Sequence, residues 1–275
     1  MRVGVVGVGN LGRALVGAIA NGGYDVVAFD TDTASTAGLA EQGVAVASTL
    51  SEVGTADVIC LVVRDDAQVV DVVGQLLPDC QKDSLLVSMS TVHPRTIDEV
   101  GAMADAAGIA FVDAPFMGQG VISVERCEAV VPVGDTGELF ERVRPIMETF
   151  ASTVLPVGGR GSGATLKLGH NVVVYVGYQT ILEGQELMRL AGVKEGMLEQ
   201  VTAATGALPV QASMMLDARA PDPSNTEAVE RMKIFAAIHD KDVNHAAMLA
   251  RELGGQLPLT ELLVGKGELV FGVES

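Results

Sequence analysis

Three glycines near the N-terminus, Gly7, Gly9 and Gly12, have a type and spacing suited to holding a phosphate group. They follow an apolar run at residues 3–6 and precede a segment whose apolar residues recur at helical spacing. In such a turn the first glycine permits the tight bend, the second lets the backbone approach a pyrophosphate, and the third lets helix and strand pack closely. The pattern therefore predicts a dinucleotide-binding turn, with a plain strand-to-helix turn as the alternative.

Asp30 ends the next β-branched run, at residues 26–29. A carboxylate at this place can accept hydrogen bonds from the adenosine ribose hydroxyls and would repel a 2'-phosphate. Residues 31–33 offer no Arg or Lys to hold such a phosphate. We therefore expect NAD to be preferred over NADP. The alternative is that Asp30 caps a helix expected to begin near Thr33 or Ala34.

A second group of polar residues, Lys167, His170 and Asn171, falls near the start of a helix expected over residues 164–191. Spacings of three and four place these side chains at neighbouring positions on the helix. A lysine that is partly desolvated beside a cofactor has a lowered pKa, which suits it to proton transfer, and Asn171 could hold the reacting oxygen. Each residue could instead be an ordinary helix residue. Their position favours the functional interpretation, because ligands of open sheets bind beyond the carboxyl ends of the strands.

The elements that must position these residues alternate between strands and helices in the first half of the chain. Strands are expected at residues 58–63, 85–87, 110–112, 129–133 and 154–157, and helices at 68–77, 95–107 and 137–150. This alternation predicts a mostly parallel sheet covered by helices on both faces.

The character of the sequence changes at a cluster of glycines, Gly158, Gly159, Gly161 and Gly163, after which segments rich in Ala, Leu, Met and Glu follow. We expect an α/β fold with a Rossmann-type dinucleotide-binding domain at residues 1–160, followed by an all-α domain at residues 161–275. Beyond the long helix, several shorter helices are expected, with breaks near Gly206, Pro209, Pro221, Pro223 and Gly254.

Composition narrows the class of protein. The 275 residues carry a formal net charge of -17, which argues against nucleic acid or an anionic membrane surface as a partner. The apolar run at 172–176 is soon interrupted by Gln and Glu, so a buried helix is favoured over a membrane span. Three cysteines without metal-ligand spacing, together with no charged-then-apolar leader, predict no metal site and a cytoplasmic location.

Five stretches in the expected order resemble the β-hydroxyacid dehydrogenases, the family that includes 3-hydroxyisobutyrate dehydrogenase, tartronate semialdehyde reductase and the N-terminal part of 6-phosphogluconate dehydrogenase. The resemblance covers nearly the whole chain. The stretches are residues 7–12, 90–94, 113–118 and 161–171, and the pair Lys241-Asp242.

The resemblance implies roles for particular residues. Lys167 would be the general acid/base, Asn171 would orient the substrate, Thr91 would contact the nicotinamide ribose, and Lys241 would close over cofactor and substrate. It also implies a small-molecule substrate and a homodimer or homotetramer in which the long helix of the helical domain packs against a partner subunit. The expected cofactor contacts are Gly7, Gly9, Asn10, Leu11, Gly12, Asp30, Val63, Arg64, Thr91 and Lys241.

Departures from the family pattern predict an altered pocket. Met117 stands where the family has a substrate-binding serine, and a thioether cannot donate that hydrogen bond. Gln119 replaces a glycine, His170 replaces an asparagine, and Arg64 replaces a proline near the nicotinamide. We expect Met117, Gly118, Gln119 and His170 to line the substrate site. The alternatives are that Met117 packs in the core, that His170 is a structural side chain, and that Arg64 lies on the surface.

These observations predict a reversible hydride transfer between a nicotinamide cofactor and a small hydroxy compound. One alternative is a reductase of C=N bonds resembling the imine reductases, which Met117 favours, whereas Lys167 together with Asn171 argues against it. The other alternative is a non-catalytic dinucleotide-binding protein.

Overall fold

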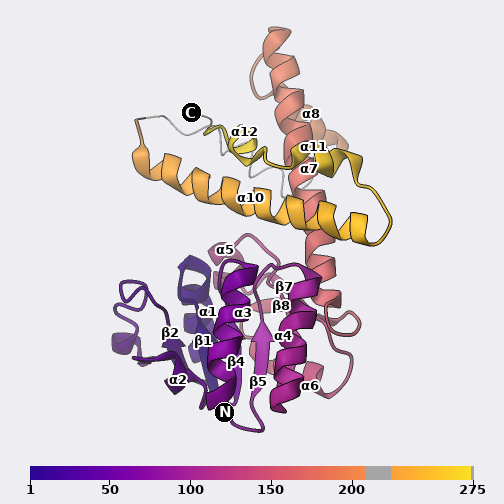
Figure 1. Ribbon diagram of the computed structural model, residues 1–275. Coiled ribbons are helices and arrows are strands. Elements are labelled where there is room, and N and C mark those ends of the chain that lie inside the picture. The colour runs from indigo at the N-terminus through magenta and orange to yellow at the C-terminus, as the bar shows by residue number, and fades with distance from the viewer. Residues whose placement is uncertain (208–223, 274–275) are drawn as a thin grey trace. The chain divides into compact units, whose positions relative to one another are not determined.

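The computed structural model describes residues 1–207 and 224–273 (Figure 1). The chain divides into two compact units, Met1–Lys167 and Leu168–Ser275. The division falls inside a helix, seven residues after the boundary that the sequence suggested at 160. Pro209, Pro221 and Pro223 lie outside the described residues.

The first unit is built on a six-stranded parallel sheet. Its strands are β1 (Arg2–Val6), β2 (Asp25–Phe29), β3 (Ala45–Val46), β4 (Val58–Leu61), β5 (Leu85–Ser88) and β6 (Ala110–Asp113), in the spatial order β3-β2-β1-β4-β5-β6. Runs of Val, Ile and Leu form these strands because a parallel sheet covered on both faces buries its side chains in both directions. The strand order reverses between β1 and β4, which is where open parallel sheets bind ligands.

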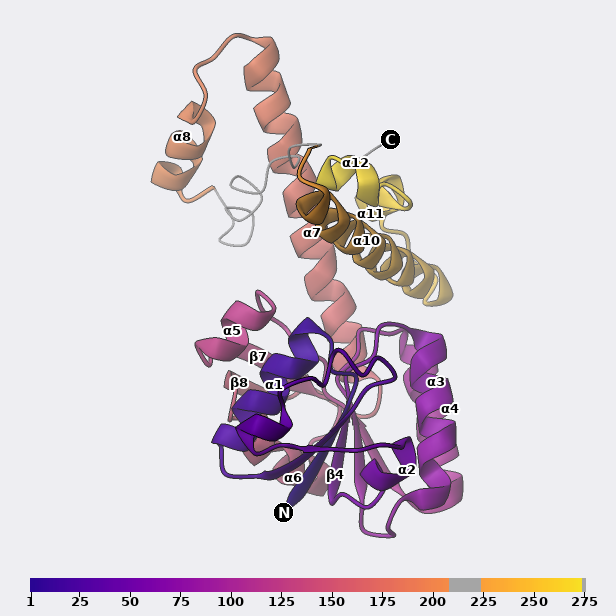
Figure 2. The same cartoon turned by 90° about the vertical axis from the view of Figure 1, so that its left-hand side faces the viewer.

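Helices cover both faces of this sheet (Figures 1 and 2). One face carries α3 (Asp66–Leu76) and α4 (Pro94–Ala107), and the other carries α1 (Asn10–Asn21) and α6 (Glu138–Met147). Shorter elements are α2 (Leu50–Val53), α5 (Val121–Glu125), η1 (Ala40–Gln42) and η2 (Leu77–Asp79).

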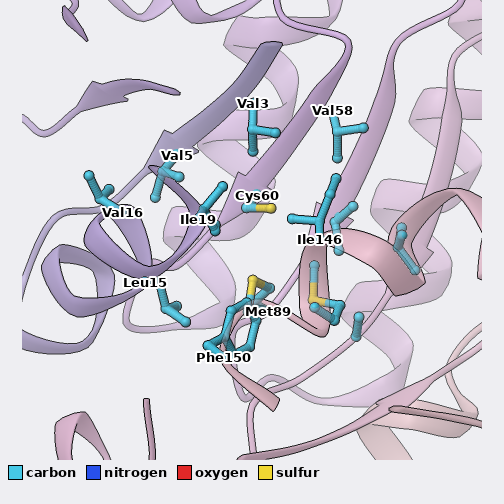
Figure 3. Packing of buried hydrophobic residues seen from close by; sticks show 14 of the residues in the cluster. Val3, Val5, Leu15, Val16, Ile19, Val58, Cys60, Met89, Ile146 and Phe150 are labelled. Atoms are coloured by element: carbon cyan, nitrogen blue, oxygen red, sulfur yellow. The ribbon is translucent and has the colours of Figure 1, made fainter. Parts of the chain in front are cut away.

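The core beneath α1 and α6 is fully apolar. Leu15 and Ile19 of α1 pack in one cluster with Val3, Val5 and Cys60 of the sheet (Figure 3). Ile146 of α6 and Phe150, which follows α6, belong to the same cluster. All seven side chains have no exposed surface. Burial raises the pKa of the Cys60 thiol to about 12, so this cysteine is an inert part of the core.

Two strands expected in the main sheet form a separate one. β7 (Ala129–Val133) and β8 (Ala151–Pro156) pair in parallel with each other. On β7 the backbone N–H and C=O of Val130 bond with those of Met117, both at 2.9 Å, so a loop after β6 occupies this edge. The expectation of one continuous sheet was wrong because the edge of β7 is used by this loop.

The helix expected near Thr33 or Ala34 is absent among the described residues. Residues 31–39 form successive turns instead. The Asp32 carboxylate accepts hydrogen bonds from the backbone N–H of Ala34 at 3.0 Å and the hydroxyl of Ser35 at 3.2 Å. Short polar side chains that bond the local backbone in this way compete with helix formation.

The second unit is helical. Its elements are α7 (Ser162–Leu190), whose first turns belong to the first unit, α8 (Met197–Thr205), α10 (Thr226–Glu252), α11 (Pro258–Leu263) and α12 (Gly267–Phe271). The long helix expected over 164–191 is confirmed as α7. α10 spans 27 residues and ends two residues before Gly254, where a break was expected. Residues 226–252 contain neither Gly nor Pro, so nothing interrupts this helix.

Within the second unit, α12 packs closely on α10 (Figures 1 and 2). A Cβ atom on Gly267 would overlap the carbonyl oxygen of Ala236, so glycine permits this contact. Val270 and Phe271 complete a small apolar core with Tyr178 and Leu182 of α7. None of the helices in the described parts of the chain has the length and apolarity needed to cross a bilayer.

Candidate functional site

The turn between β1 and α1 is shaped by backbone approaching backbone. Gly7 has φ of +94°, a conformation that side chains rarely adopt, and a Cβ atom on it would lie 2.5 Å from the carbonyl oxygen of Val62. A Cβ atom on Gly12 would overlap the carbonyl oxygen of Gly7. The two glycines therefore let α1 begin directly against the ends of β1 and β4.

The N-terminus of α1 is suited to an anion. Gly9 provides no side-chain cap, and the first turn, which contains Asn10 and Leu11, has no acidic residue. A Cβ atom built on Gly9 meets no described atom within 4 Å. The first N–H groups of a helix lack intrahelical acceptors and carry partial positive charge, so this open turn fits the pyrophosphate of a dinucleotide.

Asp30, at the end of β2, joins two loops. Its carboxylate accepts hydrogen bonds from the backbone N–H of Val8 at 2.6 Å and of Asp32 at 2.9 Å. The alternative in which Asp30 caps a helix was wrong, because no helix follows it there. The carboxylate instead fixes the glycine turn relative to the loop after β2.

Arg13 of α1 fixes the same loop from the other side. Its guanidinium donates to the carbonyl oxygen of Ser35 at 3.0 Å and to that of Ala37 at 2.8 Å. No sequence motif pointed to Arg13. Its position in the first turn of α1, directly after Gly12, was the available signal.

Val63 and Arg64 follow β4, and Thr91 follows β5, so the three residues lie in loops at neighbouring strand ends. The Ser90 hydroxyl donates to the carbonyl oxygen of Val63 at 2.8 Å and ties the two loops together. Arg64 is exposed and its backbone N–H donates to the Oε1 atom of Gln68 at 2.9 Å.

Asp66 adds a second tie between these loops, which sequence reasoning missed. Its Oδ1 atom accepts from the backbone N–H of His93 at 2.9 Å and from the hydroxyl of Thr96 at 2.6 Å. His93 is buried and caps α4 through its Nδ1 atom, which accepts from the N–H of Arg95. The first turn of α3 is thereby joined to the first turn of α4.

The loop after β6 carries Met117, Gly118 and Gln119. The Met117 side chain is 6% exposed, whereas Gly118 is exposed. The backbone N–H of Gln119 donates to the Ser123 hydroxyl at 2.8 Å, which holds the loop against α5. No sequence motif pointed to Ser123 either.

Asp113 lies at the end of β6 and is fully buried. Its Oδ1 atom accepts from the backbone N–H of Gly161, and its Oδ2 atom from that of Ala164, each at 2.8 Å. Burial raises the pKa of this carboxyl group, and the backbone N–H donors oppose that shift. In the sequence, Asp113 stood out only as the first residue of the stretch 113–118, although an acid that ends a buried strand was a signal for a role of its own.

Lys167 lies in the second turn of α7 and is the last residue of the first unit. Asn171, four residues later, belongs to the second unit. The first turn of α7, which leads to Lys167, is the turn that Asp113 holds at the end of β6.

In the second unit a buried carboxylate gathers several of the expected residues. The Oδ2 atom of Asp242, which is 2% exposed, accepts from the Nδ2 atom of Asn171 at 2.7 Å and from the hydroxyl of Tyr175 at 3.3 Å. Lys241 pairs with Asp242 at 3.0 Å, and His170 lies 3.1 Å from the Oδ1 atom of Asn171. The structure therefore brings Asn171, His170 and Lys241 together around Asp242.

Tyr175 belongs to the same cluster and was missed from the sequence. Burial and the neighbouring Asp242 carboxylate raise the pKa of its hydroxyl, so Tyr175 remains a hydrogen-bond donor. Its spacing of four residues from Asn171 on α7 was the available signal. Across residues 1–207 and 224–273, no group of three or more His, Cys, Asp or Glu side chains is arranged to hold a metal ion.

Comparison with known proteins agrees with this arrangement. Residues 2–159 match the family described as the NAD binding domain of 6-phosphogluconate dehydrogenase. An uncharacterized oxidoreductase of Mycobacterium tuberculosis is 27% identical over 282 residues, covering 99% of this chain and 94% of the relative. The 2-hydroxy-3-oxopropionate reductase of Escherichia coli is 27% identical over 269 residues, covering 94% and 88%.

The fold is shared with a solved structure of 3-hydroxyisobutyrate dehydrogenase from Mycobacterium tuberculosis with L-serine. The TM-score is 0.81 at 24% identity, and the match covers 98% of this chain and 92% of the other. The Rossmann-type sheet followed by a helical region is therefore confirmed. The chain belongs to the family of the NAD-binding domain of 6-phosphogluconate dehydrogenase, and it is an NAD(P)-binding oxidoreductase of the β-hydroxyacid dehydrogenase group.

Proposed function

We propose that this protein is an NAD-preferring dehydrogenase that oxidises a small hydroxy compound reversibly, with Lys167 as the general acid/base. The observation that carries the proposal is the attachment of α7 to the sheet: the helix that bears Lys167 begins on the Asp113 carboxylate, at the carboxyl end of β6. This edge of the sheet also carries the glycine turn. Relatives that act on hydroxy acids or their oxo counterparts, such as the reductase from E. coli, support the class of substrate.

The mechanism assigns a task to each residue. A bound nicotinamide cofactor would accept or supply a hydride at its C4 atom. In the oxidation direction neutral Lys167 takes the proton from the substrate hydroxyl, and in the reduction direction its ammonium form returns a proton to the oxygen. Asn171 orients that oxygen, while its own side chain is fixed by Asp242. Lys241 supplies positive charge toward the cofactor and the substrate.

Met117 is the residue from which we infer a substrate different from that of a typical relative. A thioether offers no strong hydrogen-bond donor to a substrate carboxylate. We infer that the pocket takes a larger or less polar hydroxy compound than a short 3-hydroxy acid. Gln119 and His170 supply the polar contacts of this altered pocket.

Turnover separates this proposal from its two rivals. The chain should reduce NAD with one or more members of a panel of hydroxy acids and alcohols, or oxidise NADH with aldehydes and ketones, as followed by nicotinamide absorbance. Reduction of cyclic imines alone would favour the imine reductase alternative. Binding of NAD without turnover of any panel member would favour a non-catalytic role.

Replacement of Asp30 tests the cofactor preference. NAD should bind the unmodified protein more tightly than NADP. Asp30→Ala should reduce this difference in affinity, because it removes both the ribose contact and the repulsion of a 2'-phosphate. Asp30→Asn is the matched control, since it keeps an oxygen acceptor for the Val8 N–H but removes the charge. Titration of both cofactors gives the ratio of dissociation constants. A preference of the unmodified protein for NADP contradicts the assignment.

Replacement of Lys167 tests the acid/base. Lys167→Ala should lower kcat by about 100-fold to 10,000-fold, the range for loss of a positioned proton donor and acceptor, and should leave NAD affinity nearly unchanged. Lys194, an exposed lysine beyond the end of α7, provides the control variant Lys194→Ala. Near-normal turnover of a folded Lys167→Ala protein would show that another group moves the proton.

Replacement of Met117 tests the altered pocket. Met117→Ser should improve kcat/KM for short 3-hydroxy acids by about tenfold, chiefly through a lower KM, because a hydrogen bond to a charged carboxylate contributes about 1.5–3 kcal/mol. Met117→Ala removes the thioether without adding a donor and separates the effect of volume. If short hydroxy acids are already excellent substrates and the serine changes nothing, the inferred pocket is wrong.

We also infer a homodimer or homotetramer that forms through the helical unit. The support is a set of exposed apolar side chains on its two long helices, Val173, Leu187 and Leu190 on α7 and Ile234 on α10, each at least 60% exposed. Light scattering should give a mass of two or four times 28.4 kDa. Val173→Glu should lower that mass, whereas Leu155→Glu in the first unit should not. A monomer at micromolar concentration would contradict the inference.

A further inference from the structure

Asp113 receives its hydrogen bonds from a segment that is distant in sequence. Its carboxylate accepts hydrogen bonds from the backbone N–H groups of Gly161 and Ala164, which are 48 and 51 residues later in the chain. Both carboxylate oxygens are used, one for each N–H. Because Ala164 lies in the first turn of α7, the carboxylate acts as the cap of that helix from a neighbouring strand.

The surroundings of Asp113 leave the carboxylate little freedom. The residue has no exposed surface, and a Cβ atom on Gly163 would lie 2.8 Å from its Oδ2 atom and 2.9 Å from the carbonyl oxygen of Pro132. A Cβ atom on Gly134 would overlap the Oδ1 atom. Glycines therefore surround the carboxylate on two sides and let the first turn of α7 approach it closely.

Asp113 is connected to two segments that carry proposed site residues, one through its backbone and one through its side chain. The backbone continues from Asp113 directly into the loop that carries Met117, and the side chain holds the turn that lies three residues before Lys167. The backbone of Asp113 is itself fixed, since its carbonyl oxygen accepts from the N–H of Gly134 at 2.8 Å. A shift of the carboxylate would thus move the start of α7 relative to the Met117 loop.

We propose that Asp113 is a positioning residue for the reaction: its carboxylate sets the place of the Lys167 side chain relative to the substrate loop. The inference rests on the proposed role of Lys167 as the general acid/base. Asp113 acts through the backbone of α7 and exchanges no proton with the substrate. A misplacement of about 1 Å at a reacting group can reduce turnover by about 100-fold, so a cap of this kind is sufficient to govern the rate.

A double-mutant cycle tests the proposal. Asp113→Asn keeps the volume of the side chain but turns one acceptor into a donor that faces a backbone N–H. In the presence of Lys167 we expect kcat to fall by about tenfold to 100-fold, with NAD affinity changed less than about twofold. In a Lys167→Ala background, whose residual turnover no longer uses the lysine, Asp113→Asn should lower kcat by less than about threefold.

Controls separate positioning from general loss of structure. Asp105→Asn removes an exposed ion pair to Arg160, which precedes the same turn, and should leave kcat nearly unchanged. Gly163→Ala alters no charge but crowds the Asp113 carboxylate and the carbonyl oxygen of Pro132, so it shifts the first turn of α7 by another route. It should reproduce the pattern of Asp113→Asn and provides a second variant if Asp113→Asn fails to fold. Thermal unfolding and NAD titration accompany each variant.

The results separate the positioning role of Asp113 from the acid/base role of Lys167. An equal loss of kcat in both backgrounds, or a parallel loss of NAD affinity, would show that Asp113 supports the fold in general and would overturn the proposal. Near-normal turnover of Lys167→Ala itself would instead overturn the proposed acid/base. A loss confined to the Lys167 background, with intact NAD binding, is the result expected.

Discussion

Parallel pairing of all six strands in the main sheet is the constraint on which the arrangement of the first unit depends. Parallel strands point their carboxyl ends to the same edge, so residues that follow different strands meet there although they are distant in sequence. Gly7 follows β1, Asp30 follows the neighbouring β2, and Thr91 follows β5. Asp113 ends β6 at the same edge. The glycine turn and the start of α7 therefore lie at the same edge of the sheet.

Carboxylates then join the loops at this edge to one another. Asp30 bonds the N–H of Val8, Asp66 bonds that of His93, and Asp113 bonds those of Gly161 and Ala164. Each bond satisfies a backbone donor at the start of a turn or helix, where the positive end of the helix dipole favours a negative charge. In the second unit Asp242 has a similar task, although its donors are the side chains of Asn171 and Tyr175. These four aspartates, which the sequence alone does not distinguish from surface charges, therefore hold separate segments of the chain together through hydrogen bonds.

Sequence patterns predicted the parts of the fold whose signals are local. The buried β-branched runs gave strands close to their observed bounds, and the glycine turn and the long α7 helix were also predicted. β3, with two residues, and α2, with four, are too short to leave a periodic signal. The separate sheet of β7 and β8 was missed because strand partners are chosen by distant contacts, here by the loop at Met117. The roles of Arg13, Asp66 and Tyr175 likewise depend on hydrogen-bond partners between 22 and 67 residues away in the sequence.

In the proposed reaction, hydride passes directly between the substrate carbon and the cofactor. The most direct measurement uses the best hydroxy substrate of the panel with deuterium at its carbinol carbon, followed by proton NMR of the reduced cofactor. Direct transfer predicts deuterium at C4 of the nicotinamide, on a single face, with no exchange into solvent. Deuterium that appears in water, or a reduced cofactor that carries only protium at C4, would contradict the account.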